Sequence, residues 1–259
     1  MQTLRRLLYL AVGALAWHDV ALGQSAEDQR AAEETEFPGL RLVATRHVDQ
    51  RLTLLGIRLA YVERDVRLGT TGKYFCGGLS LDRAVAGADP VGTALARLPY
   101  ESVRKLGLRY VILCGGAKSG ERGIGGIPVP PLNLLMLNVG VDALTPRLEG
   151  LTLHELYHMV ELRFDAFRDA DWDQQFTGYL GDYAAADPST EAKPGFLNWY
   201  AQTFPHEDRA ELFSALLLRP DDVAARIRAT NDAVLRRKVL YMDQKSRNLL
   251  GLKLAPLGL

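Results

Sequence analysis

Short apolar runs, rich in β-branched and aromatic residues, follow one another through the first half of the chain. Their partial alternation of apolar and polar positions predicts strands, although the second run could also hold a short helix. A later run, Tyr-Val-Ile-Leu-Cys, is apolar throughout, as expected of a buried strand. The runs that predict strands are residues 40–46, 51–68, 73–81, 110–114 and 127–140.

One helix and one loop interrupt these predicted strands. Asp89 before Pro90 predicts a helix start, and apolar residues follow at helical spacing up to residue 108. Residues 115–126 are rich in glycine but lack the spacing of a phosphate-binding loop, so we interpret them as a mobile surface loop. Prolines at the start of 127–140 favour an edge strand, where a missing N–H group is tolerated.

In the second half of the chain the apolar residues recur at helical spacing. Thr145 and Pro146 resemble an N-cap followed by a proline in the first turn. Another helix is predicted to begin near Pro205 and to end before Pro220, and one or two more occupy residues 219–251. Strands followed by helices predict an α+β fold in one domain, with a small mixed sheet and a helical C-terminal half.

The amino terminus has the pattern of a secretory signal peptide. Two arginines precede an apolar run, Leu7–Trp17, that is well short of the roughly 20 residues needed to span a membrane. Small residues follow and favour cleavage before Gln24. We therefore expect a signal peptide over residues 1–23, a flexible acidic leader over 24–36 and a single domain over 37–259. The mature protein would be secreted or periplasmic, without a stable membrane anchor.

The composition disfavours nucleic acid as a partner, and the two cysteines of the chain are candidates for a disulfide. The chain has 259 residues, with 31 basic and 31 acidic side chains and a net charge of zero, so no overall field attracts nucleic acid. A content of 47% hydrophobic residues is typical of a globular chain with a core. The two cysteines, Cys76 and Cys114, could form a disulfide in an oxidising location, and two separate buried thiols are the alternative.

The most specific chemical pattern is HExxH at residues 154–158, inside a predicted helix. Positions four apart share one face of a helix, so His154 and His158 can bind one metal ion. Glu155 lies beside them and can take a proton from water bound to zinc, which lowers the pKa of that water toward about 7. The alternative is that both histidines are exposed on the surface and bind no metal. The apolar character of this helix disfavours that alternative. The pattern therefore predicts a zinc site with Glu155 as general base.

A catalytic zinc needs a third protein ligand and an open position. The predicted helix after Pro205 offers Glu207, with His206 as the competing ligand. The apolar stripe of this helix leaves Glu207 beside the buried face and turns His206 away. Glu211 lies four positions after Glu207, so it can accept a hydrogen bond from a ligand imidazole. An ion pair of Glu211 with Arg209 is the alternative, but residues two apart lie on different faces of a helix.

Four aspartates follow the HExxH helix. They could favour basic residues in a substrate or bind calcium, but the segment lacks the EF-hand pattern. We interpret it as a solvated loop. The aspartates are Asp165, Asp169, Asp171 and Asp173.

Taken together, the two motifs resemble the catalytic domain of the anthrax lethal factor type of zinc metallopeptidase, a glutamate-zincin. Glu207 follows HELYH after 48 intervening residues, Tyr200 stands seven residues before Glu207, and the pattern E-x-x-A-E-x-F ends at Phe213. The resemblance covers about residues 128–245. It implies a zincin-like fold in which His154, His158 and Glu207 bind the zinc. It further implies Glu155 as general base, Tyr200 as the donor to the oxyanion, and Glu211 as a carboxylate that contacts a ligand from outside.

The function that this resemblance implies is hydrolysis of peptide bonds by an exported zinc-dependent metallopeptidase. Its substrate would be a peptide or protein bound as an extended strand along residues 127–140, which lie where the family places its substrate-binding edge strand. A zinc-stabilised, catalytically silent binding protein of the same fold is the first alternative. An exported module acting on peptidoglycan-type peptides is the second.

Overall fold

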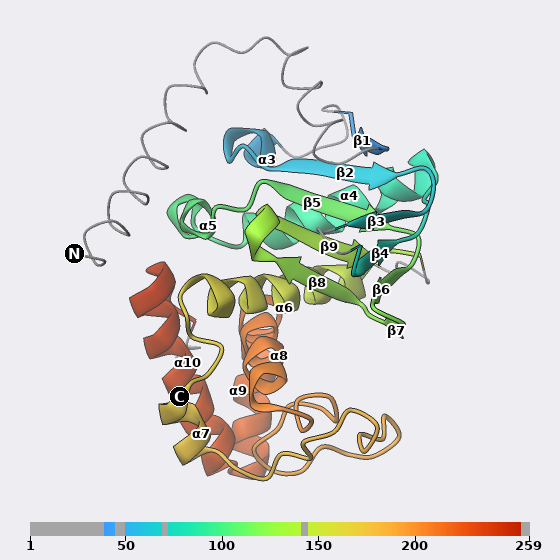
Figure 1. Cartoon of the computed structure of the whole chain (residues 1–259). Coiled ribbons are helices and arrows are strands. Elements are labelled where there is room, and N and C mark those ends of the chain that lie inside the picture. Colours follow the sequence, from blue (N-terminus) through green and yellow to red (C-terminus); the bar gives the residue numbers. More distant parts are fainter. Residues whose placement is uncertain (1–38, 45–49, 69–71, 141–144, 255–259) are drawn as a thin grey trace, which may run out of the picture. The chain divides into compact units, whose positions relative to one another are not determined.

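A computed structural model describes residues 39–44, 50–68, 72–140 and 145–254 of the chain. The predicted signal peptide, its cleavage site and the acidic leader lie outside these described residues. The described chain is α+β, with one mixed and one antiparallel sheet in its amino-terminal half and mainly helices in its carboxy-terminal half (Figure 1). A search of the described helices for one with the length and apolar character of a membrane span found none.

The larger sheet has five strands in the order β1-β2-β5-β9-β8. Strands β2, β5 and β9 are parallel, whereas β8 pairs antiparallel with β9 and forms one edge. The predicted buried strand is β5, and each of its residues is buried. The predicted run 127–140 divides into β8 and β9 around a 3-10 turn at Pro130–Leu132. The bounds are Leu40–Leu42 (β1), Arg58–Val62 (β2), Tyr110–Cys114 (β5), Gly126–Val129 (β8) and Leu134–Asn138 (β9).

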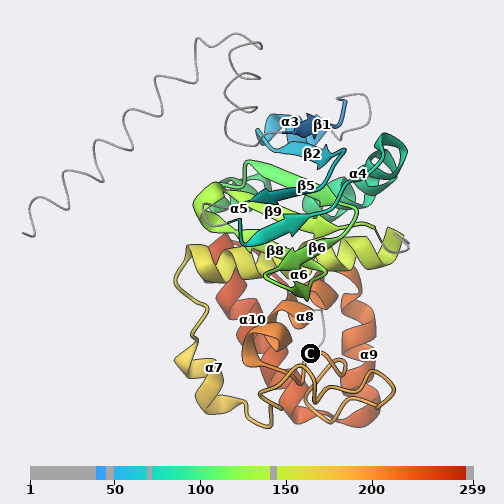
Figure 2. The same ribbon diagram turned by 45° about the vertical axis from the view of Figure 1, so that its right-hand side comes forward.

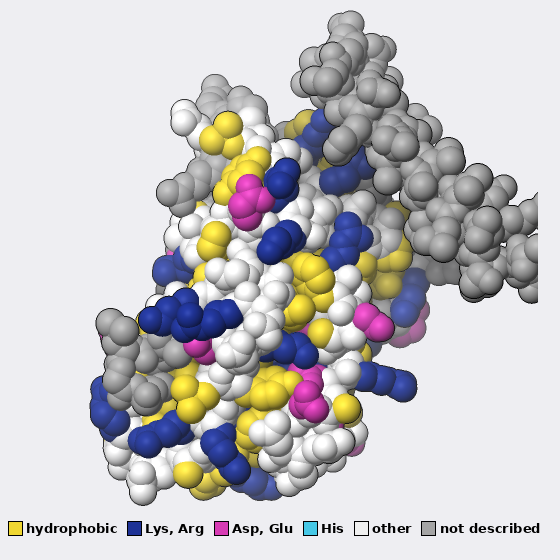
Figure 3. All heavy atoms as spheres, turned by 90° about the vertical axis from the view of Figure 1, so that its left-hand side faces the viewer, with side chains coloured by type: hydrophobic (Ala, Val, Ile, Leu, Met, Phe, Trp, Pro, Cys, Tyr) yellow, Lys and Arg dark blue, Asp and Glu magenta, His cyan; other side chains and the backbone are white. Residues whose placement is uncertain are grey.

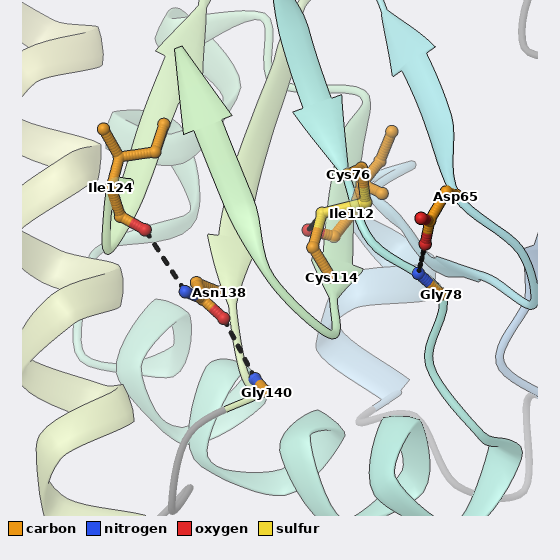
Figure 4. Close-up of a disulfide and its surroundings, with 8 residues drawn as sticks. All are labelled: Asp65, Cys76, Gly78, Ile112, Cys114, Ile124, Asn138 and Gly140. Carbon is orange, nitrogen blue, oxygen red and sulfur yellow. Dashed lines mark hydrogen bonds between the residues drawn. A yellow bond between two sulfur atoms is a disulfide. The ribbon is translucent and has the colours of Figure 1, made fainter. Parts of the chain in front are cut away.

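A second, antiparallel sheet has the order β3-β4-β6-β7, with bounds Val66–Leu68, Tyr74–Cys76, Ala117–Ser119 and Arg122–Gly123. Its last two strands lie in the glycine-rich segment, so the interpretation of 115–126 as a mobile surface loop is wrong. The segment forms a hairpin because Gly120 adopts a φ of 61° at the turn and β6 pairs with β4. A disulfide between Cys76 and Cys114 joins β4 to the end of β5 (Figure 4).

Helix α4, Leu81–Ala96, begins well before the start that was predicted at Asp89, so that prediction is wrong. Pro90 lies inside the helix and is buried, although an interior proline costs about 3 kcal/mol. Tertiary packing outweighs this cost, because Gly87 lets α4 approach side chains from three other segments. A Cβ at Gly87 would lie 3.3–3.7 Å from side-chain atoms of Leu113, Val139 and Leu148.

The carboxy-terminal helices begin where the sequence predicts. Helix α6 starts at Thr145, α8 starts at Pro205, and two further helices follow from Pro220. Helix α6 crosses beneath the larger sheet and contacts β8 and β9. Helix α8 packs against the side of α6 that faces away from this sheet (Figures 1 and 2). The helix bounds are Gln50–Leu54 (α3), Tyr100–Leu106 (α5), Thr145–Arg163 (α6), Ala170–Gln175 (α7), Pro205–Leu218 (α8), Pro220–Thr230 (α9) and Ala233–Leu250 (α10).

The acidic segment after α6 is not wholly a solvated loop, which corrects the interpretation from sequence. Asp169 is buried, caps the short helix α7 by accepting a hydrogen bond from the Trp172 N–H group, and pairs with Lys245 at 3.0 Å. Tyr241 also donates a hydrogen bond to this carboxylate. Asp169 therefore anchors α7 to α10, whereas the other three aspartates are exposed.

Candidate metal centre

Three buried side chains from two helices converge on one point. His154 and His158 lie one turn apart on α6, and Glu207 lies in the first turn of α8. Their facing atoms form a triangle, with 3.1 Å between the two Nε2 atoms and 3.0 and 3.3 Å from these to Glu207 Oε2. Each residue is at most 7% exposed. The predicted ligands are thus brought together, and they form a group that could hold a metal ion.

The other ring nitrogens of both histidines face carboxylates. His154 Nδ1 lies 2.8 Å from Glu211 Oε1, and His158 Nδ1 lies 3.2 Å from Glu161 Oε2. An ionised carboxylate only accepts hydrogen bonds, so these contacts favour a proton on each Nδ1. The Nε2 atom of a neutral ring then presents its lone pair to the centre of the triangle.

The triangle fits zinc both in size and in charge. Ligand atoms about 2.0–2.1 Å from a tetrahedral zinc lie about 3.3 Å apart, close to the three distances observed. Two lone pairs and a carboxylate oxygen buried this close repel one another unless a positive charge lies between them. Burial lowers the pKa of His158, but its hydrogen bonds to Glu161 and Glu207 outweigh this and raise the pKa to about 9. The pocket therefore attracts either a proton or a metal cation.

Glu155 lies next to this centre and is buried, without being one of the three converging residues. Burial raises the pKa of its carboxyl group, and the two histidines partly oppose that rise. Its side chain packs against the backbone of β8, where a Cβ at Gly126 would lie 2.7 Å from Glu155 Cγ. Gly126 therefore makes room for Glu155, the general base that the sequence predicts.

Two tyrosines bind the far oxygen of Glu207. The Tyr200 hydroxyl donates to Oε1 at 3.1 Å, and the Tyr183 hydroxyl donates to the same atom at 2.6 Å. Burial is the first cause that raises the pKa of Tyr200, and the nearby Glu207 carboxylate raises it further. With Oε1 occupied in this way, Oε2 is the oxygen that faces the histidines.

Several residues near the centre have other partners. His206 lies 3.5 Å from Glu207 Oε1 and contributes no atom to the triangle, in line with its predicted orientation. Arg209 pairs with Glu161, not with Glu211. The Glu211 carboxylate instead accepts a hydrogen bond from Asn198 as well as facing His154.

Sequence reasoning did not identify Glu161, Tyr183 or Asn198. Glu161 stands three positions after His158 on the same helix, and this spacing could have indicated it. The other two lie in the long irregular segment between α7 and α8, where no periodicity relates a residue to the metal centre.

A cleft of about 1270 Å³ runs past the centre. The edge strand β8 and the β6–β7 hairpin form one wall, and residues of α6, α8 and the segment before α8 form the other. The metal centre is therefore buried at its ligands but open on one side to this cleft.

Replacing Glu211 with glutamine is expected to weaken zinc binding about 10- to 100-fold, because the amide cannot hold the His154 Nδ1–H group as the carboxylate does. Competition with a fluorescent chelator would measure the zinc affinity. Glu149→Gln is the matched control, since Glu149 lines the same cleft but pairs with Arg97. Equal zinc affinity of the two variants would contradict this role of Glu211.

For the peptide hydrolysis that the sequence predicts, replacing Gly126 with alanine is expected to lower the rate about a hundredfold with zinc retained, because the new Cβ would displace Glu155 or β8. Gly123→Ala is the control, since a Cβ there meets no atom within 4 Å. Rates and zinc content of both variants would be measured together. If both glycine variants lost activity equally, the close approach of Gly126 to Glu155 would not be the reason.

Comparison with known proteins agrees with the fold but is sparse. No family model matches the chain, and no curated protein sequence matches it. Its structure is similar to the crystal structure of a candidate zinc-binding metallo-peptidase from Bacteroides caccae ATCC 43185, with a TM-score of 0.52 over 90% of each chain at 13% identity. The chain therefore shares the fold of that protein, and this fold is α+β as the sequence predicts.

Proposed function

We propose that this protein is an exported zinc metallopeptidase that hydrolyses peptide bonds with Glu155 as general base, of the type that includes the anthrax lethal factor catalytic domain. The observation that carries the proposal is the buried triangle of His154, His158 and Glu207, with both imidazole Nδ1 atoms held by carboxylates. These three residues would hold the zinc. Bound there, zinc would act as a Lewis acid toward the scissile carbonyl and lower the pKa of water.

The remaining residues of the site would move protons and hold charge. Glu155 would accept a proton from the attacking water and pass it to the leaving amine. Its burial supports this role, because a raised pKa brings a carboxylate closer to the pKa of a working base. Tyr200 would donate its hydroxyl proton in a hydrogen bond to the developing oxyanion, which requires the hydroxyl to leave Glu207 Oε1 while Tyr183 stays bound there.

We further propose that the substrate binds as an extended strand on the free edge of β8. Asn138 N–H donates to Gly125 C=O, so the alternation of an antiparallel ladder directs the backbone of Gly126 and Pro128 away from β9. Gly126 then offers both an N–H and a C=O group, and Pro128 offers a C=O group only. A peptide antiparallel to β8 would use these groups and lie beside Gly126, the residue that packs against Glu155.

Export is supported by the disulfide between Cys76 and Cys114, because disulfides persist mainly outside the reducing cytosol. The disulfide joins the two sheets and so fixes the β6–β7 hairpin beside the cleft. We therefore propose a secreted or periplasmic protein.

Zinc content and turnover, measured on the purified 24–259 protein, test the proposed function. We expect one zinc per chain by elemental analysis, cleavage of a peptide library, loss of cleavage when a chelator removes the metal, and recovery when zinc is added back. One tightly bound zinc with no cleavage of any peptide would favour the silent binding protein. Absence of zinc after incubation with the metal would overturn the assignment.

A further inference from the structure

The end of the cleft where α6 begins carries unpaired positive charge. Arg97, Arg147 and Arg219, here called the arginine cluster, come from the ends of α4, α6 and α8 and line the same cleft. Arg97 pairs with Glu149 at 3.2 Å and also donates to the Leu217 carbonyl. Within the described part of the chain, Arg147 and Arg219 form no ion pair.

Acidic side chains do not balance this charge. Apart from the three carboxylates of the metal centre and its neighbours, Glu149 is the one acidic residue among the described residues that line the cleft. Since Glu149 is paired with Arg97, the exposed guanidinium groups of Arg147 and Arg219 leave a positive charge near two at this end, and the N-terminus of α6 adds a partial positive charge. The fourth basic side chain of the cleft, Arg122, lies over the Tyr183 ring nearer the metal centre. The face shown in Figure 3 also carries basic side chains, which are spread over its surface among apolar side chains and a few acidic ones.

The opposite end of the cleft is apolar and aromatic. Leu162 and Phe167, at and beyond the last turn of α6, line it, and both are exposed. Pro130 lies at the same end, just after β8. The cleft therefore changes from cationic to apolar along the direction of α6.

Strand β8 runs in the same direction as α6, so the peptide proposed above to bind antiparallel to β8 has a defined direction along the cleft. A Cβ at Gly125 would lie 3.1 Å from Leu151, whereas Asn133, just beyond β8, accepts a hydrogen bond from Arg163. A peptide antiparallel to β8 would therefore run against α6. Its residues before the scissile bond would lie near Leu162 and Phe167, and its residues after that bond would lie near the arginine cluster.

We propose that the substrates are peptides with acidic side chains on the carboxy-terminal side of the scissile bond, recognised by Arg147 and Arg219. This inference rests on the proposed peptidase function and adds a substrate class to it. It reverses the sequence-based alternative that an acidic segment selects basic substrates, because Asp169 is buried in an ion pair away from the cleft.

The test uses three peptides that differ in carrying Glu, Gln or Lys at the two positions after one scissile bond. We expect kcat/KM for the Glu peptide to exceed that for the Gln peptide roughly tenfold and to fall as salt is added. The double variant Arg147→Gln, Arg219→Gln should lose this preference, and Arg147→Glu, Arg219→Glu should favour the Lys peptide. Arg237→Gln on α10 is the control, since Arg237 is exposed and does not line the cleft.

Binding to the zinc-loaded Glu155→Gln variant, measured by calorimetry, separates this inference from the proposed function. Cleavage that ignores the charge of the peptide, or a preference that survives charge reversal, would overturn the inference and leave the peptidase intact. Charge-dependent binding of the peptides without cleavage by the native protein would support acidic recognition and overturn the peptidase. Melting temperatures close to that of the native protein would show that the arginine variants are folded.

Discussion

Replacing Glu155 with glutamine is expected to lower kcat/KM for peptide hydrolysis by about a factor of 100 to 10,000, the range typical of a lost general base. Glutamine matches the shape of glutamate but cannot accept the proton of the attacking water. Glu155 is absent from the group that converges on the metal site, so zinc should still bind with one ion per chain. Steady-state rates with a fluorogenic peptide and elemental analysis of the same sample would measure both quantities.

Glu155→Asp is the informative companion to this variant. This variant keeps a carboxylate but shortens the side chain by one methylene group. If Glu155 is the general base, the aspartate variant should therefore retain more activity than the glutamine variant. Activity of Glu155→Gln within tenfold of the native protein would contradict the mechanism. Loss of zinc from Glu155→Gln would show instead that Glu155 supports the ligands.

The parts of the site that could be predicted from sequence are those governed by helical periodicity. HExxH places two histidines on one face of α6, and Glu207 and Glu211 are related in the same way on α8. Each pair lies within one helix, whose start is indicated by Thr145 or Pro205. The spacing of four residues was therefore enough to predict that each pair shares a helix face. The packing of α8 against α6, which brings Glu207 to the two histidines, cannot be derived from the periodicity of either helix. The resemblance to a known family predicted it instead.

Other features depend on contacts between distant segments, and local rules failed there. Pro90 indicated a helix start, but the packing around Gly87 continues α4 through it. Tyr183 reaches Glu207 across 24 positions from an irregular segment, so no spacing could identify it. Asp169 was predicted to be solvated, but it is buried in an ion pair with Lys245, which lies 76 positions away in the sequence. In each case the deciding partner lies far away in sequence.

Glu207→Ala is expected to weaken zinc binding by more than the roughly 10- to 100-fold typical of losing an outer partner, because it removes one of three ligands. It also leaves the hydroxyl groups of Tyr183 and Tyr200 without their common acceptor. His206→Ala is the matched control on the preceding residue, since His206 contributes no atom to the triangle. Competition with a chelator would measure both affinities.

These two variants decide which residue is the third ligand. Since Glu207 Oε2 completes the triangle while Oε1 is held by two tyrosines, the carboxylate is oriented to bind zinc through one oxygen. His206→Ala should therefore keep zinc within a few fold of the native affinity. If His206→Ala lost zinc and Glu207→Ala retained it, His206 would be the ligand, and the orientation of Glu207 by Tyr183 and Tyr200 would have no role in metal binding.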